Sequence, residues 1–74
     1  MMLEVRLFAT FRDGREKILF LDSQEYSCAA DILNHLHIPA EEVAILLING
    51  RHSKPEAQVR DGDVLALFPP VGGG

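Results

Sequence analysis

Apolar and polar residues alternate along the first dozen positions of the chain. Every second residue from Leu3 to Phe11 is apolar, and most of the residues between them are polar. A period of two predicts a strand with one buried face. The dipeptide Asp13-Gly14 suits the positive φ angles of a tight turn, so we expect residues 18–21 to return as an antiparallel strand.

From residue 29 the apolar positions recur at steps of three and four. This spacing, seen at Ala29, Ile32, Leu33 and Leu36, predicts a helix of about ten residues. Ser27 stands where an N-cap is expected. A proline at position 39 stops the helix, and residues 40–42 are expected to add a short extra turn.

The second half of the chain contains two further apolar segments. Residues 43–48 are apolar at positions of both parities, which is typical of an interior strand. Asn49-Gly50 follows as a strong turn signal. A second turn, Asp61-Gly62-Asp63, precedes a final strand over residues 64–68, and we expect its aspartates to serve the turn rather than catalysis.

The order of these elements is strand, strand, helix, strand, a short strand and strand. We interpret it as an α+β chain with the β-grasp, or ubiquitin-like, fold, in which one main helix lies across a mixed sheet. The last strand should run parallel to the first and beside it, so that the C-terminus leaves from the rim of the sheet. Residues 1–68 are the predicted β-grasp domain, and residues 69–74 are the predicted flexible tail.

The tail combines stiff and flexible residues. Pro69 removes an N–H that a neighbouring strand could use, and Pro69-Pro70 directs the chain outward. The glycines that follow are slender and conformationally free. Extended, residues 69–74 reach about 20 Å. The terminal carboxylate could therefore enter the active site of a partner, while the folded part stays outside.

Composition limits the class of partner and the location. The chain has 74 residues, which is enough for one domain, and a net charge of -4, which disfavours nucleic acid and anionic membranes. No apolar run approaches the ~20 residues of a membrane span. Cys28 is the only cysteine, and residues 1–8 resemble a strand rather than a signal sequence. We expect a cytoplasmic protein.

Four blocks of sequence form a pattern over nearly the whole chain: Val5-Arg6-Leu7-Phe8-Ala9 with Arg12, Ile48-Asn49-Gly50, Asp61-Gly62-Asp63-Val64 and Phe68-Pro69-Pro70-Val71-Gly72-Gly73-Gly74. With these blocks the chain resembles the MoaD/ThiS family of ubiquitin-like sulfur carriers. The Pro-Pro pair before the glycines makes it most similar to the molybdopterin branch.

The resemblance implies that Gly74, preceded by Gly73, is adenylated and then converted to a thiocarboxylate. An E1-like adenylyltransferase would use ATP for this step, a sulfurtransferase or cysteine desulfurase would provide sulfur, and the molybdopterin synthase large subunit would hold the tail. The chain would bind no cofactor and supply no catalytic side chain, acting as the sulfur-donating small subunit of the synthase. It has no Gly-rich phosphate loop.

Other functions share some of these features. A carrier for thiamine thiazole, other sulfur metabolism or tungsten cofactors would have the same glycine pair. A ubiquitin-like modifier would be joined through Gly74 to lysines, and a noncovalent interaction module would not be activated at all.

Several side chains are candidates for partner binding. Phe8 lies on the polar face of the first strand and could form an apolar docking patch near the tail with these residues: Phe68, Pro69, Pro70, Val71 and Gly72. Burial of Phe8 by loops of the chain itself is the alternative. Arg12 matches an early arginine of the family and could pair with an acidic group, as could Arg15, Lys17 and Arg60, for which solvation is the default.

The cysteine and the histidines support no catalytic or metal-binding hypothesis. Cys28 lies in the first predicted helical turn, where a reactive thiol is possible, but a structural role is favoured. His35 and His37 are two residues apart and would point in different directions on a helix, and His52 lies elsewhere. We expect no metal site.

Overall fold

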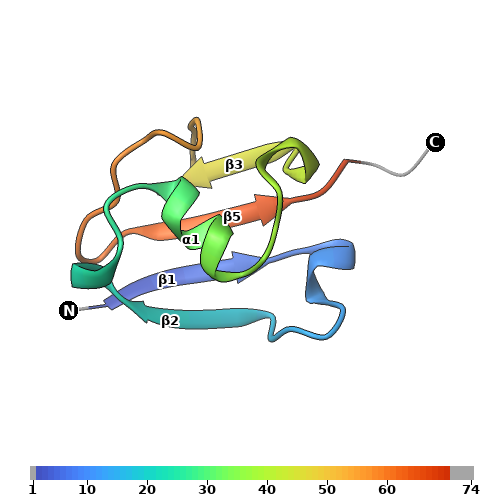
Figure 1. Ribbon diagram of the computed structural model, residues 1–74, viewed down its shortest axis with the longest axis horizontal. Coiled ribbons are helices and arrows are strands. Elements are labelled where there is room, and N and C mark those ends of the chain that lie inside the picture. The colour runs from blue at the N-terminus through green and yellow to red at the C-terminus, as the bar shows by residue number, and fades with distance from the viewer. Residues whose placement is uncertain (1, 71–74) are drawn as a thin grey trace.

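The computed structural model describes residues 2–70, which form one mixed sheet with a helix across one face (Figure 1). The strands are β1 (Met2–Leu7), β2 (Ile18–Asp22), β3 (Ile45–Ile48), β4 (Arg51–His52) and β5 (Val64–Phe68). The helix is α1 (Ala29–His35), and three short 3-10 helices are η1 (Ala9–Arg12), η2 (Ser23–Glu25) and η3 (Ala40–Glu42).

The sheet has the strand order β2-β1-β5-β3-β4. β1 and β5 at its centre are parallel, with Leu7 beside Leu67, whereas β1–β2, β3–β5 and β3–β4 are antiparallel. This is the predicted β-grasp arrangement, including the parallel pairing of the first and last strands. The first hairpin cannot bury its apolar face alone, and α1 supplies the cover.

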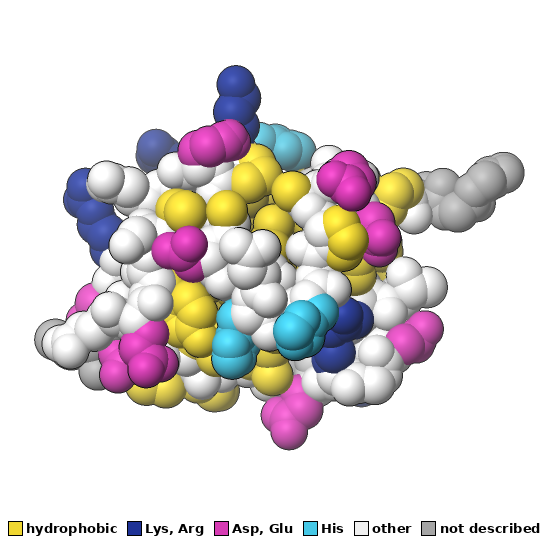
Figure 2. Space-filling view, in the orientation of Figure 1, with side chains coloured by type: hydrophobic (Ala, Val, Ile, Leu, Met, Phe, Trp, Pro, Cys, Tyr) yellow, Lys and Arg dark blue, Asp and Glu magenta, His cyan; other side chains and the backbone are white. Residues whose placement is uncertain are grey.

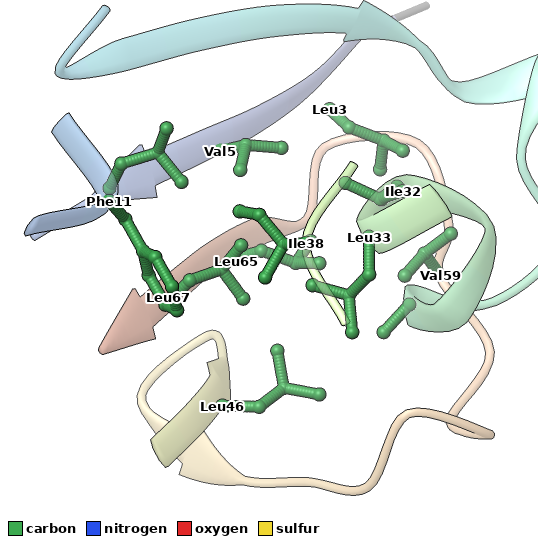
Figure 3. Packing of buried hydrophobic residues seen from close by; sticks show 12 residues of the cluster. Leu3, Val5, Phe11, Ile32, Leu33, Ile38, Leu46, Val59, Leu65 and Leu67 are labelled. Atoms are coloured by element: carbon green, nitrogen blue, oxygen red, sulfur yellow. The ribbon is translucent and has the colours of Figure 1, made fainter. Parts of the chain in front are cut away.

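The core lies between the sheet and α1 (Figure 3). Alternate residues of the central strands point into it, and each fully buried side chain contributes about 1.5–3 kcal/mol. Its members come from β1, β5, β3, α1, η1 and the loops: Leu3, Val5, Leu7, Phe11, Ala29, Ile32, Leu33, Ile38, Leu46, Val59, Leu65 and Leu67. No polar or charged side chain among residues 2–70 is buried.

The prediction that the first strand continues to Phe11 is wrong. β1 ends at Leu7, and Ala9 adopts a left-handed backbone with φ 53° where η1 begins. The chain leaves the sheet there, and Phe11 turns back to close the end of the core with 5% exposure. The tight Asp13-Gly14 hairpin is wrong for the same reason, because residues 8–17 form a longer connection, although Gly14 does have a positive φ of 69°.

The helix begins later and ends earlier than its apolar spacing predicts. Its N-cap is Cys28 rather than Ser27, and the Asp31 carboxylate accepts hydrogen bonds from the N–H groups of Ser27 (2.9 Å) and Cys28 (3.4 Å). Those two N–H groups have no partner in the helix itself. α1 ends at His35, before His37 adopts a φ of 60°. No helix among the described residues is long and apolar enough to cross a membrane.

The two predicted turns in the second half are joined by side-chain hydrogen bonds. The Asn49 side chain accepts from the N–H of Val64 and donates to the Asp63 carboxylate, both at 2.9 Å. That carboxylate also accepts from the N–H of Arg60 at 2.8 Å. Asn49 and Gly50 have φ of 53° and 80°, as the turn requires. The bonds connect the start of β5 to the end of β3, which begins at Ile45 rather than at residue 43.

Replacing Asn49 with alanine should lower the free energy of unfolding by about 1–3 kcal/mol, because two hydrogen bonds are lost and alanine tolerates a left-handed backbone poorly. Urea unfolding measures the change. Arg51→Ala, at a neighbouring exposed position, is the control and should change stability little. Equal stability of the two variants would contradict the role given to Asn49.

Candidate functional site

The end of β5 is the point at which the chain leaves the sheet. On one side, the N–H of Phe8 donates to the carbonyl of Leu67 (3.2 Å). On the other side, the N–H of Ala44 donates to the carbonyl of Phe68 (2.9 Å). Pro69 has no N–H and cannot extend either ladder. The predicted end of sheet pairing before Pro69 is confirmed, and β5 stops at Phe68.

Two phenylalanines and an arginine meet at this exit. The rings of Phe8 and Phe68 stack with their centroids 4.3 Å apart and their planes at 10°. The Arg12 guanidinium carbon lies 5.2 Å from the centroid of the Phe8 ring, within the range of a cation–π contact. Both phenylalanines remain partly exposed. We call these three side chains the Phe8–Phe68 cluster; they form a surface that is partly apolar and positively charged at one end.

Arg12 is held in place by the backbone. Its Nε donates to the carbonyl of Leu7 at 2.7 Å, which leaves the rest of the exposed guanidinium available. The ion pair found among residues 2–70 joins Arg6 and Glu4, so within this range no carboxylate neutralises Arg12. The cluster therefore suits a partner that offers an acidic group beside an apolar one.

A hollow of about 750 Å³ opens next to the cluster. Its walls come from η1, from the segment that follows α1, from the start of β3 and from the exit itself: Ala9, Thr10, Phe11, Arg15, His37, Ile38, Glu42, Ile45, Phe68, Pro69 and Pro70. Figure 2 shows hydrophobic side chains at this end of the molecule, with acidic and basic side chains around them. A hollow of this character can accept an apolar side chain from a protein that docks over the exit.

Arg15 has a structural role in this region. Its Nε and Nη2 donate to the carbonyl of Leu36 at 3.3 and 3.1 Å, and its Nη1 donates to the carbonyl of Phe11 at 3.4 Å. The guanidinium thus ties the connection between β1 and β2 to the end of α1. It also fixes one wall of the hollow.

The structure brings together most of the predicted partner-binding residues. Phe8 is neither fully exposed nor buried by loops, because its ring is covered on one side by Phe68. Arg12, Pro69 and Pro70 lie at the same end. The predicted roles of four further residues, and the predicted flexibility of the tail after Pro70, fall outside the described residues: Val71, Gly72, Gly73 and Gly74.

The walls of the hollow are not predictable from the sequence. The alternation of apolar residues predicts a strand at Phe11, and Ile38 and Ile45 carry no local signal that sets them apart from ordinary core residues. They meet only because the connection after β1 folds back toward the segment after α1. A left-handed backbone at Ala9 and at His37 reverses the chain after β1 and after α1. The identity of these two residues is not enough to predict that conformation.

Groups with possible chemistry lie elsewhere in the described part of the chain. Cys28 is partly buried, and its backbone forms an isolated antiparallel β-bridge with that of Gln58 at the start of α1, consistent with a structural role. The rings of Tyr26 and His35 form a T-shaped pair, with their centroids 5.6 Å apart. Burial, followed by the negative charges of Glu25 and Asp22, raises the pKa of the Tyr26 phenol. Within residues 2–70, no three His, Cys, Asp or Glu side chains are grouped to hold a metal ion.

The chain is similar to known proteins along its whole length. The model of the ThiS family matches residues 5–74. Small archaeal modifier protein 3 of Haloferax volcanii is 30% identical to this chain, and the match covers 100% of both proteins.

Two solved structures have the same fold. The crystal structure of SAMP1 from Haloferax volcanii aligns over 100% of both chains with a TM-score of 0.75 and 26% identity. A chain in the complex of subunits 1 and 2 of molybdopterin-converting factor from Helicobacter pylori also aligns over 100% of both chains, with a TM-score of 0.65 and 26% identity.

The contact between Phe8 and Phe68 should be measurable as a coupling in stability. Phe8→Leu and Phe68→Leu, alone and combined, should give a coupling free energy of about 0.5–1.5 kcal/mol in a double-mutant cycle of urea unfolding. The same cycle with Phe20→Leu in place of Phe68→Leu should give no coupling, because Phe20 lies on β2. Equal coupling free energies in the two cycles would contradict direct stacking as the source of the coupling between Phe8 and Phe68.

Proposed function

Because the chain belongs to the ThiS family of ubiquitin-like proteins, which includes sulfur carriers, we propose that it carries sulfur on its C-terminal carboxylate. The observation that carries the proposal is the exit at Phe68, where β5 stops at a proline beside the Phe8–Phe68 cluster. The family match continues past this exit to residue 74. The reacting group is the carboxylate of Gly74, and the folded domain is the part that partner proteins bind.

The proposed chemistry takes place on partner enzymes. On an E1-like adenylyltransferase, the Gly74 carboxylate attacks the α-phosphorus of ATP and pyrophosphate leaves. A persulfide (R–S–S⁻) on a sulfurtransferase or cysteine desulfurase then attacks the acyl carbon with its outer sulfur and displaces AMP, which forms an acyl disulfide. A second thiol attacks the donor's sulfur in that S–S bond, so that a disulfide forms on the donor and a thiocarboxylate remains on Gly74. Gly73 and Gly74 have no Cβ, so they hinder these attacks least. Dependence on ATP fits a cytoplasmic location.

The docking surface for these partners is the Phe8–Phe68 cluster together with Pro69, Pro70 and the adjoining hollow. An apolar contact on the stacked rings and an acidic group near Arg12 would fix the orientation of the domain. The tail would then extend from a defined point on that surface. Binding energy from the domain would serve to place a small carboxylate correctly.

We assign the carrier to molybdopterin biosynthesis, as the small subunit of molybdopterin synthase. Two findings support this branch: the sequence Phe68-Pro69-Pro70 before the terminal glycines, and the similarity to a chain of the Helicobacter pylori molybdopterin-converting factor complex. The large subunit of the synthase is then the partner that receives the tail.

A protein modifier is the second candidate. The relative at 30% identity is named as a small archaeal modifier, and SAMP1 has the same fold with a TM-score of 0.75. A modifier would use the same adenylation of Gly74. The acyl carbon would then be attacked by the amine of a lysine instead of sulfur, and the product would be an isopeptide bond.

Deletion of Gly74 should abolish sulfur loading without unfolding the domain, because a terminal residue contributes little to stability. The measurement is intact mass after co-expression with an E1-like enzyme and a sulfur source. The complete chain should show one oxygen-to-sulfur exchange, and the truncated chain none. Heavier conjugates of the complete chain would instead identify a modifier, and loading of the truncated chain would contradict Gly74 as the acceptor.

The docking surface can be tested separately from the chemistry. Phe8→Ala and Arg12→Ala should each raise the KM of the activating enzyme for this chain by about tenfold and change kcat little, because they remove binding that is equal in the ground and transition states. Phe20→Ala is the matched control, since Phe20 is also exposed but lies on β2. An equal rise in KM for Phe20→Ala would contradict the assigned surface.

A further inference from the structure

We propose that the open edge of β2 pairs antiparallel with β2 of a second molecule of the same chain, so that two sheets become one. This dimer uses no residue of the exit or the tail, and it goes beyond the proposed function. Its centre is Phe20. The evidence comes from the backbone of β2, from its exposed side chains and from its charges.

β2 is an edge strand whose outer backbone groups are free to pair. It is bonded to β1 alone and forms the lower edge of the sheet in Figure 1. The N–H of Leu7 donates to the carbonyl of Lys17 at 2.8 Å, at the end of the β1–β2 ladder. Bonded pairs alternate in an antiparallel ladder, so Leu19 and Leu21 also turn their backbone groups toward β1. Those of Ile18, Phe20 and Asp22 point to the open edge.

The side chains along this edge are unusually apolar for a strand without a neighbour. Phe20 is 60% exposed and Ile18 45% exposed, and Met2 beside Asp22 is 48% exposed. Proteins commonly guard edge strands with a proline, an inward-pointing charge, a bulge or lysines along the strand. Residues 18–22 contain none of these devices. The edge is therefore suited to pairing.

The charges of the edge select a second copy as the partner. Arg6, which pairs with Glu4 in the same chain, lies beside Ile18 on the outer face of the sheet, and Asp22 ends β2 on that face. An antiparallel pair that places Asp22 of one copy opposite Ile18 of the other brings this carboxylate into the row of Arg6. The match occurs twice in a two-fold dimer. A segment without the same polarity would be matched at one end at most.

The same charges select the register. Pairing centred on Phe20 places the two Phe20 rings across from each other and places Glu16 opposite the neutral Gln24. Moving the centre to Leu19 would place Glu16 opposite Asp22, which brings two carboxylates together. Moving it to Leu21 would place Asp22 opposite Phe20, in the row of Glu4, which again brings two carboxylates toward each other. Of the three registers, the one centred on Phe20 places Asp22 opposite Ile18, in the row of Arg6.

The dimer has a geometric consequence for the two tails. The two-fold axis is perpendicular to the joined sheets, so both α1 helices lie on the same face. Because β5 runs parallel to β1 and antiparallel to β2, the two Phe68 exits lie at opposite ends of the dimer. Each exit is left open to a separate partner. Loss of the dimer therefore need not affect sulfur loading, and the two proposals can fail independently.

Sedimentation of the full chain over concentrations up to about 1 mM tests the pairing. We expect a monomer–dimer equilibrium, and Phe20→Lys should raise the dimer Kd at least about tenfold, because two like charges would meet at the two-fold axis. Ile45→Lys is the matched control: Ile45 is 39% exposed but lies on β3, so its Kd should not change. Circular dichroism melts check that both variants fold.

Amide hydrogen exchange by NMR tests which strand pairs. At high concentration the amides of Ile18, Phe20 and Asp22 should exchange more slowly than at low concentration, whereas those of Leu19 and Leu21 should be protected at both. If the chain stays monomeric, the proposal is overturned, and the partner of the β2 edge would then be an extended segment of another protein. A dimer in which these three amides gain no protection, or in which Ile45→Lys weakens association as much as Phe20→Lys, also overturns it.

Discussion

The parallel pairing of β1 with β5 is the contact on which the rest of the molecule depends. It joins residues that are about 60 positions apart in the sequence, Val5 to Leu65 and Leu7 to Leu67, and all four are fully buried. The pairing closes the core under α1. It also places the end of β5 beside the end of β1, so the exit of the chain is built from two distant segments.

The surface at the exit is a direct product of that pairing. Phe8 is the first residue after β1 and Phe68 is the last residue of β5, and both project from the face of the sheet opposite α1. Their rings stack because the register aligns them. The proposed docking surface therefore includes the root of the tail itself, and a partner that recognises one is already in position to receive the other.

The outer face of the sheet leaves apolar surface exposed, which costs free energy of folding that a small domain can hardly spare. Met2, Ile18, Phe20 and Ile45 are all substantially exposed, although burial of apolar surface is the main stabilising term. The arrangement is easier to understand when the face is divided between two uses. The end near Phe68 would serve the partners of the tail, and the edge at β2 would serve pairing with a second copy, so neither use competes with the other.

The sequence by itself determined the order of the elements, the last strand, the Asn49-Gly50 turn and the proline at which pairing ends. These features are local, because periodicity and turn chemistry act over a few neighbouring residues. The clustering of Phe8 with Phe68 was also accessible, since the fold predicted from that order places the two strands side by side.

Only the tertiary structure decided where β1 ends, how residues 8–17 cross to β2 and which residues line the hollow. Phe11 continues the alternation of a strand, yet it leaves the sheet, because closing the end of the core outweighs continued pairing. The N-cap of the helix is likewise Cys28 rather than Ser27, because a backbone β-bridge between Cys28 and Gln58 fixes the chain there. In each case a contact with a distant segment overrode the local pattern, and no short stretch of sequence records such contacts.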